Sequence, residues 1–203
     1  MPENVTRPTL LMRIKDPADQ LAWEEFVDLY TPMLFGYCVK RGLQEADAAD
    51  VVQEMMRSIS LAIERFDYDR EKGTFRAWLF TVAHSRLCHY FRRQSRQPQP
   101  VSDSALQVLV DQPSADEERD WDLAYKKRLF EWAADRVKSK VARNTWEAFW
   151  RVTIDEESVD KVAESLTMSP GAIYVAKSRT IVALKRELEE IIGEDGDLNV
   201  DVA

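Results

Sequence analysis

Cysteine and histidine are scarce in this chain of 203 residues, which has only Cys38, Cys88, His84 and His89. Two cysteines are too few for a disulfide framework, so reduced thiols in a cytoplasmic protein are the simplest interpretation. A zinc site needs three or four ligands, and no Cys-x-x-Cys pair supplies them. A glycine-rich phosphate loop and a nucleophile elbow are also absent. We therefore expect no metal, no cofactor and no catalytic centre.

Glycine and proline are also few, with six and eight residues, and no stretch alternates apolar and polar residues as a strand does. The apolar runs are short, and no charged segment followed by an apolar one opens the chain. We therefore expect neither a membrane span nor a secretory signal. The composition favours an all-α fold.

Acidic residues outnumber basic ones, giving a net charge of -8, but the excess is confined to two segments. Residues 103–122 carry seven acids and one arginine, and residues 187–203 carry seven acids and no base, so the rest of the chain is basic. Two acid-free basic runs stand out: Arg86, Arg92, Arg93 and Arg96, and then Lys177, Arg179, Lys185 and Arg186. Basic helices are typical of nucleic-acid contact, although a charge run is more often just a solvated face.

The first part of the chain has the apolar spacing of three helices. The first is predicted to begin at Asp16-Pro17 and to reach Gly42, with Pro32 bending or breaking it. The second extends from about Asp47 to Phe66. A polar loop at 67–73 follows, and Thr74 then caps a third helix, which ends at Arg92-Arg93.

Residues 97–120 contain proline, glutamine, serine and the first acidic cluster, without a sustained helical stripe. This composition predicts an acidic flexible linker. The predicted organisation is all-α, with two small helical domains at 10–96 and 121–192, and an acidic tail at 193–203.

Residues 158–179 have the pattern of two helices joined by a tight turn. Ser169 is placed to cap the second helix, with Pro170 at its first position. Ile173, Ala176 and Thr180 share one helix face, which leaves Tyr174, Val175, Ser178 and Arg179 pointing elsewhere. Such a helix-turn-helix suits the DNA major groove. The alternative is an ordinary helical hairpin in an all-α core.

Three motifs occur together in the order found in one family. These are Asp50-Val51-Val52-Gln53-Glu54, then Phe75-Arg76-Ala77-Trp78-Leu79-Phe80 ending in Arg92-Arg93, and the helix-turn-helix at 158–186. With them the chain resembles the extracytoplasmic-function (ECF) group of sigma-70-type transcription initiation factors. The resemblance covers residues 10–96 and 121–190.

The resemblance implies a role for each motif. It implies binding of core RNA polymerase by Asp50, Gln53 and Glu54. It implies contact with the melted −10 promoter element by Tyr68, Ser85, Arg86, His89, Arg92 and Arg93. It implies contact with the −35 element by Tyr174, Val175, Lys177, Ser178 and Arg179. Trp78 matches a family aromatic that belongs to the core.

The chain departs from the family pattern within the third helix. The family commonly has Ala-Arg-Asn where Ala83-His84-Ser85 stands, and an aspartate where His89 stands. The substitution at Ser85 affects a position that engages the melted strand in the family.

The resulting hypothesis is a cytoplasmic, non-enzymatic factor that directs core RNA polymerase to promoter DNA. An anti-sigma factor is a further partner that the resemblance allows. The acids Asp116, Glu117 and Glu118 are hypothesised to occupy a basic channel of the polymerase. The alternative is a helix-turn-helix repressor or activator that acts without core polymerase, and it leaves the motifs at 50–54 and 75–93 unexplained.

Overall fold

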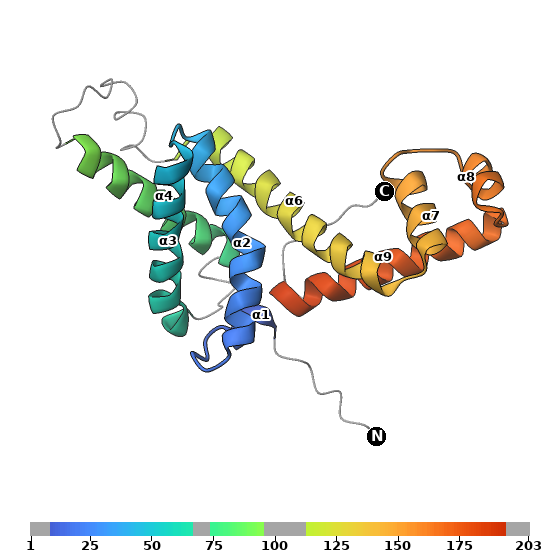
Figure 1. Cartoon of the computed structure of the whole chain (residues 1–203), viewed down its shortest axis with the longest axis horizontal. Coiled ribbons are helices and arrows are strands. Elements are labelled where there is room, and N and C mark those ends of the chain that lie inside the picture. The colour runs from blue at the N-terminus through green and yellow to red at the C-terminus, as the bar shows by residue number, and fades with distance from the viewer. Residues whose placement is uncertain (1–8, 67–73, 96–112, 194–203) are drawn as a thin grey trace. The chain divides into compact units, whose positions relative to one another are not determined.

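The computed structural model describes residues 9–66, 74–95 and 113–193, and in these ranges every regular element is a helix (Figure 1). The all-α prediction is therefore confirmed. The elements are α1 (Leu10–Arg13), α2 (Gln20–Lys40), α3 (Glu45–Ala62), the 3-10 helix η1 (Ile63–Arg65), α4 (Phe75–Ser95), α6 (Ala115–Lys140), α7 (Arg143–Thr153), α8 (Val159–Leu166) and α9 (Pro170–Ile192).

The chain divides into two compact units, one formed by Met12–Arg128 and the other by Met1–Leu11 with Leu129–Ala203. We call them the N-terminal unit and the C-terminal unit. The boundary falls inside α6, eight residues beyond the end of the linker that we predict at 97–120. Residues 96–112 of that linker lie outside the described ranges.

In the N-terminal unit, α2, α3 and α4 pack around an aromatic and aliphatic core (Figure 1). Phe26 and Tyr30 of α2 are fully buried and contact Phe75 of α4, with ring centroids 6.1 and 5.7 Å away. Trp78, which we assign to the core, packs on Phe66 at 4.8 Å. These contacts fix which faces of α3 and α4 point outward.

The start of α2 differs from the prediction. The helix begins at Gln20, and its cap is Asp19, whose carboxylate accepts a hydrogen bond from the Ala22 amide at 2.9 Å. Arg13 donates to the other carboxylate oxygen at 3.0 Å, and this hydrogen bond lowers the pKa of Asp19. Asp16, the predicted cap, instead accepts from the Ala18 amide in a local turn.

Pro32 does not break α2, which continues through it to Lys40. Proline has no N–H, so the Asp28 carbonyl loses its helical donor. The Arg128 guanidinium replaces it, with Nη2 2.9 Å from the Asp28 oxygen and Nε 2.8 Å from the Leu29 oxygen. A tertiary contact therefore satisfies the backbone groups that the sequence pattern leaves open.

We expect a double-mutant cycle to detect this coupling. Arg128→Met should lower the free energy of unfolding by about 1–3 kcal/mol, because it leaves two carbonyls without their donor. In a Pro32→Ala background the cost should be smaller by at least ~0.5 kcal/mol, because the alanine N–H can donate to Asp28. Urea unfolding of the four proteins measures the coupling. Equal costs in both backgrounds would exclude this role for Arg128.

The first half of α6 belongs to the N-terminal unit, so the predicted linker is too long. Residues 115–120 are helical, and Ser114 caps the helix by accepting from the Glu117 amide at 3.2 Å. Trp121 is buried against Tyr37 and Phe80, with both centroids 5.2 Å away. These aromatic contacts are between positions far apart in sequence, which is why a composition argument misses them.

Glu117 is the most deeply packed acid of this helix, with 6 % of its surface exposed. Its Oε1 accepts a hydrogen bond from the Tyr37 hydroxyl at 2.7 Å, pairs with Arg41, and lies 3.3 Å from Nδ1 of His84. Burial by itself raises the pKa of Glu117, but the hydrogen bonds from Tyr37 and Arg41 outweigh it and bring the pKa below its ordinary value. The side chain is therefore a buried carboxylate that has three partners at Oε1.

We expect Glu117→Gln to lower the free energy of unfolding of the N-terminal unit by about 2–4 kcal/mol, because it leaves the half-buried Arg41 without its counter-charge. The matched control is Glu118→Gln, at an exposed neighbouring position, which should change it by less than about 0.5 kcal/mol. Urea unfolding followed by hydrogen exchange of peptides from 12–128 measures both. Equal effects of the two substitutions would contradict the role of Glu117 as the buried partner of Arg41.

The stabilisation by Glu117 should also depend on pH. Because its folded pKa lies below the unfolded value of about 4.5, the contribution is complete above that pH and is lost as the pH falls through the folded pKa. The stability difference between the wild type and Glu117→Gln should therefore shrink below pH 4.5. A difference that stays constant down to pH 2 would show that the carboxylate charge is not involved.

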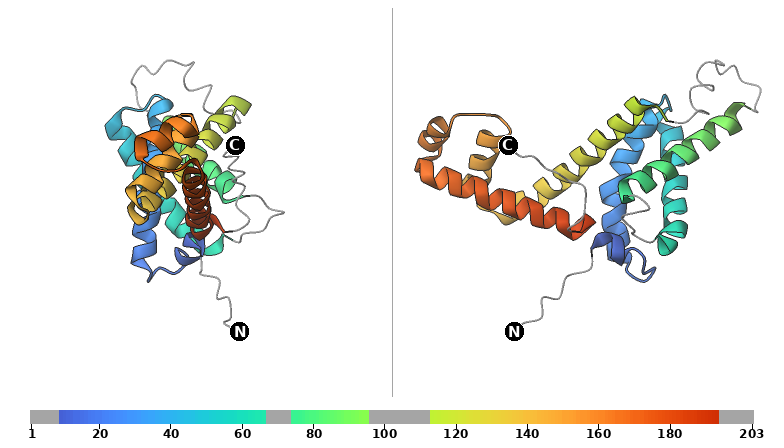
Figure 2. Two further views of the ribbon diagram at one scale, coloured as in Figure 1. Left: turned by 90° about the vertical axis from the view of Figure 1, so that its right-hand side faces the viewer. Right: turned by 180° about the vertical axis from the view of Figure 1, so that it is seen from behind.

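In the C-terminal unit, α7 and α8 pack against the long α9 (Figure 2). Their common core is small, with Ala148, Val162, Ala163, Ile173 and Ala176 buried together. Glu187 of α9 is 1 % exposed and pairs with Nε of Arg136 at 3.0 Å and Nζ of Lys140 at 2.5 Å. We count Glu187 in the acidic C-terminal segment from the sequence, yet it is an interior residue.

Candidate polymerase and nucleic-acid interfaces

The α3 helix has one buried and one exposed face. Val52, Met55 and Ile59 are buried in the core of the N-terminal unit. Asp50, Gln53 and Glu54 are all exposed on the opposite side, where their spacing of three and four residues puts them on one face. Two carboxylates and an amide on a rigid helix can accept hydrogen bonds from a basic partner surface.

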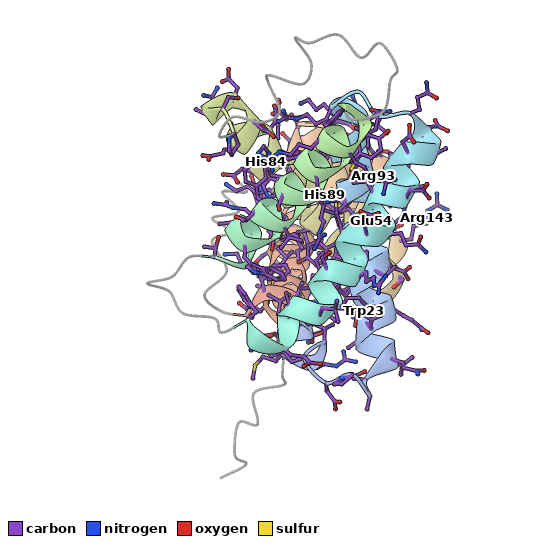
Figure 3. All side chains as sticks on the ribbon, turned by 90° about the vertical axis from the view of Figure 1, so that its left-hand side faces the viewer. Trp23, Glu54, His84, His89, Arg93 and Arg143 are labelled. Carbon is purple, nitrogen blue, oxygen red and sulfur yellow. The ribbon has the colours of Figure 1, made fainter. Side chains whose placement is uncertain are left out.

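The exposed side of α4 carries the first basic run. Ser85, His89 and Arg92 follow one another at helical spacing and are exposed, and Arg93 is exposed beside them. Arg86 is half-buried on the same side. Figure 3 shows His89 and Arg93 on α4, with Glu54 on the neighbouring α3. The structure thus brings together five of the six residues predicted for the −10 element.

The sixth residue, Tyr68, lies in the loop at 67–73, outside the described residues.

His84 is turned away from the exposed basic side of α4. Its side chain is 16 % exposed and faces the first turn of α6, with Nδ1 3.3 Å from Glu117 and Nε2 3.4 Å from the Cys88 sulfur. Burial raises the pKa of the Cys88 thiol. His84 belongs to the Glu117 cluster, on the other side of α4 from Arg86.

The connection between α8 and α9 is tight. Thr167 ends α8 in the left-handed conformation, with φ of 55°, and the Met168 amide donates to the Ala163 carbonyl at 2.9 Å. Ser169 then caps α9 by accepting from the Ala172 amide at 3.2 Å, and Pro170 is the first helical residue. Ser169 is therefore the cap of α9 and Pro170 its first residue, as the sequence predicts.

The first three turns of α9 have distinct inner and outer faces. Ile173, Ala176 and Thr180 are buried. On the outer face Tyr174 is 60 % and Val175 49 % exposed, and Ser178 and Arg179 are exposed as well. Lys177 is half-buried at the edge. The outer face offers an arginine, a hydroxyl and an apolar surface, a combination that can contact phosphates and base edges.

Two further observations concern metal binding and membrane-spanning helices in the described ranges. No group of three or more His, Cys, Asp or Glu side chains is placed there to hold a metal ion. None of the helices described combines the length and the apolar character that crossing a membrane requires.

Residues 26–97 match the protein family described as Sigma-70 region 2. The matched range contains both the acidic face of α3 and the basic face of α4. The chain is also 29 % identical, over 91 residues, to the ECF RNA polymerase sigma factor RpoE of Cereibacter sphaeroides. Part of the chain is therefore similar to sigma-70 region 2 and to an ECF sigma factor.

The match to RpoE covers 45 % of this chain and about half, 49 %, of that protein. The region 2 match ends at residue 97, before α6. The matched segment contains most of α2 and all of α3 and α4, whereas α6, which packs against them, lies beyond it.

Sequence reasoning missed Glu117 and Arg128 as structural residues of the N-terminal unit. A signal for the helix start was present, because Ser114 and Glu117 have the spacing of a capping box. The glutamate, however, uses its carboxylate on Tyr37 and Arg41 instead of on the Ser114 amide, and no sequence pattern indicates those partners.

We expect the two faces of α9 to respond differently to truncation. Ile173→Ala should lower the stability of the C-terminal unit by about 2–5 kcal/mol, because it opens a cavity in a small core. Val175→Ala should change it by less than about 0.5 kcal/mol, since that side chain is half exposed. Hydrogen exchange of peptides from 129–193 distinguishes them. A large loss with Val175→Ala would mean that the outer face is packed rather than free.

Proposed function

We propose that this protein is a bacterial transcription initiation factor that acts in the cytoplasm with core RNA polymerase. The observation that carries the proposal is the acidic face of α3 beside the basic face of α4, both within the segment that matches sigma-70 region 2. One face suits a basic protein partner and the other suits DNA, so a single rigid unit can hold both at once.

In the proposed mechanism, Asp50, Gln53 and Glu54 dock on the core enzyme. Arg86, Arg92 and Arg93 meet promoter phosphates, while Ser85, His89 and Tyr68 engage the opened −10 element. Phosphate contacts supply affinity that falls with salt, and they position the strand without reading its sequence. The chemistry of RNA synthesis belongs to the polymerase, and the factor needs no cofactor.

For the C-terminal unit we propose recognition of the −35 element by the outer face of α9. Arg179 is the best placed for a base-edge or phosphate contact, and Val175 can touch a thymine methyl group. Tyr174, Lys177 and Ser178 complete the proposed surface. The support for this role is the tight turn after α8 together with the exposure of these side chains at the start of a capped helix.

The hypothesis that three linker acids enter a polymerase channel needs revision. Glu117 is a buried partner of Arg41 and Tyr37, so it is not available for that role. Asp116 and Glu118 are exposed, and the hypothesis now rests on these two and on acids at 96–112. Whether an anti-sigma factor binds this protein is a separate proposal that the resemblance to sigma factors suggests.

The deciding experiment is transcription by bacterial core RNA polymerase, with and without this protein, on a library of random upstream DNA. We expect new initiation sites that share a two-part upstream motif. Initiation without a shared motif would contradict promoter recognition. If nothing initiates and the protein alone retains a specific DNA site, the repressor or activator hypothesis replaces this one.

The acidic face of α3 gives a sharper test of polymerase binding. Asp50→Ala with Glu54→Ala should weaken binding to core polymerase by about 10-fold or more, because two charged contacts are lost at once. Asp135→Asn, at an exposed position on α6, is the control and should bind as the wild type does. Fluorescence anisotropy of the labelled protein measures both. Unchanged affinity of the double variant would move the docking surface elsewhere.

The outer face of α9 has its own test. Arg179→Ala should weaken promoter binding of the holoenzyme by about 1–3 kcal/mol, the usual scale for such a contact. The exposed position of Arg179 means that folding should be unaffected. Transcription from the identified promoter measures the effect. Unchanged promoter strength would show that another face contacts the −35 element.

A further inference from the structure

A pocket of about 390 Å³ lies in the N-terminal unit, where the turn before α2, the start of α2 and the end of α3 meet. Its volume is in the range of pockets that hold ligands, roughly 300–1,000 Å³. Trp23 of α2 supplies an aromatic wall, and its ring is held by stacking on Phe26 at 5.3 Å and 13°. Figure 3 shows Trp23 near the start of α2 and Glu54 midway along α3.

The charge of the pocket lining is unbalanced. Among the described residues that line it are three acids, Asp16, Glu24 and Glu64, and one cation, Lys15, and these four together carry a net charge of -2. Among the residues that the structure describes, neither Glu24 nor Glu64 has an ion-pair partner. An indole ring with unpaired carboxylates around it is a favourable surrounding for a guanidinium or ammonium group.

The exposed face of α3 leads toward the pocket, which Ser60 and Glu64 line. Counting along the helix from Asp50, Arg57 and Leu61 fall at the seventh and eleventh positions, so they lie on the same face. Glu64, in η1, continues this line into the pocket. Leu61 is 71 % exposed, and Leu21, next to the lining residue Gln20, is 74 % exposed. Large apolar side chains beside an acidic pocket are common in protein interfaces.

We propose that this pocket is a second contact for core RNA polymerase, where it receives an arginine or lysine side chain of the polymerase while Leu21 and Leu61 pack on apolar residues around that side chain. The inference rests on the proposed function and extends its docking surface from Asp50 to Trp23. An arginine fits best, because its planar group can stack on the indole ring and pair with both glutamates.

The test neutralises the pocket without touching its packed residues. Glu24→Gln with Glu64→Gln should weaken binding to purified bacterial core polymerase by about 5- to 20-fold at low salt, and the deficit should shrink as salt screens the charges. Leu61→Ala should weaken it independently of salt. The control is Asp135→Asn with Glu189→Gln, which removes two exposed acids outside the pocket.

The outcomes separate this inference from the proposed function. If the Asp50 and Glu54 variant loses affinity while the pocket variants bind normally, the pocket proposal is wrong and the proposed function stands. If the wild type does not bind core polymerase at all, the proposed function fails and the pocket proposal fails with it. A pocket variant that weakens binding equally at all salt concentrations would contradict the charge pairing. Circular dichroism melting of each variant excludes a folding defect as the cause.

Discussion

The N-terminal unit depends on a carboxylate that is buried with its partners. Glu117 reaches from the first turn of α6 to Tyr37 and Arg41 at the end of α2 and to His84 on α4, so one side chain joins three helices. Removing a carboxylate from water is costly unless its charge is matched, and here Arg41 and the Tyr37 hydroxyl provide the match at Oε1. Around it, Lys40 pairs with Asp120 at 2.7 Å and Arg76 with Asp122 at 3.1 Å. These acidic residues of α6 thus hold the helix against the rest of the N-terminal unit.

The acidic residues of the chain therefore do not all have the same role. The chain has a net charge of -8, and its acidic residues are of two kinds: some are buried and stabilise the fold, and others are exposed. Glu117 and Glu187 are interior and paired, one in each unit. Asp50 and Glu54 are exposed on the outer face of α3. A count of charges along the sequence cannot separate these two kinds of acid, although only the second kind can recognise a partner.

The proposed contact surfaces all follow from the same division between inner and outer helix faces. On α3, α4 and α9 the apolar stripe is buried, which fixes how each helix is rotated about its axis. The polar residues opposite the stripe must then face outward. This is why Arg93 and Arg179 are exposed although they lie in different units. It is also why His84 is not available to DNA, because its position on α4 faces the Glu117 cluster. The family match covers α3 and α4, so the argument for the C-terminal unit rests on its geometry alone.

The sequence alone determined the helical fold, the stripes of α3 and α9, and the cap and turn at Thr167–Pro170, because these depend on contacts between residues close in the chain. It also indicated which residues of α3, α4 and α9 would be exposed. Tertiary structure alone decided that Pro32 is tolerated, since its missing hydrogen bond is compensated by Arg128 from ninety-six positions later. It also decided that residues 115–120 are part of a packed helix, and that Trp23 and Glu64 line one pocket. Such contacts between distant positions leave no periodic pattern in the sequence, because they depend on how whole helices pack.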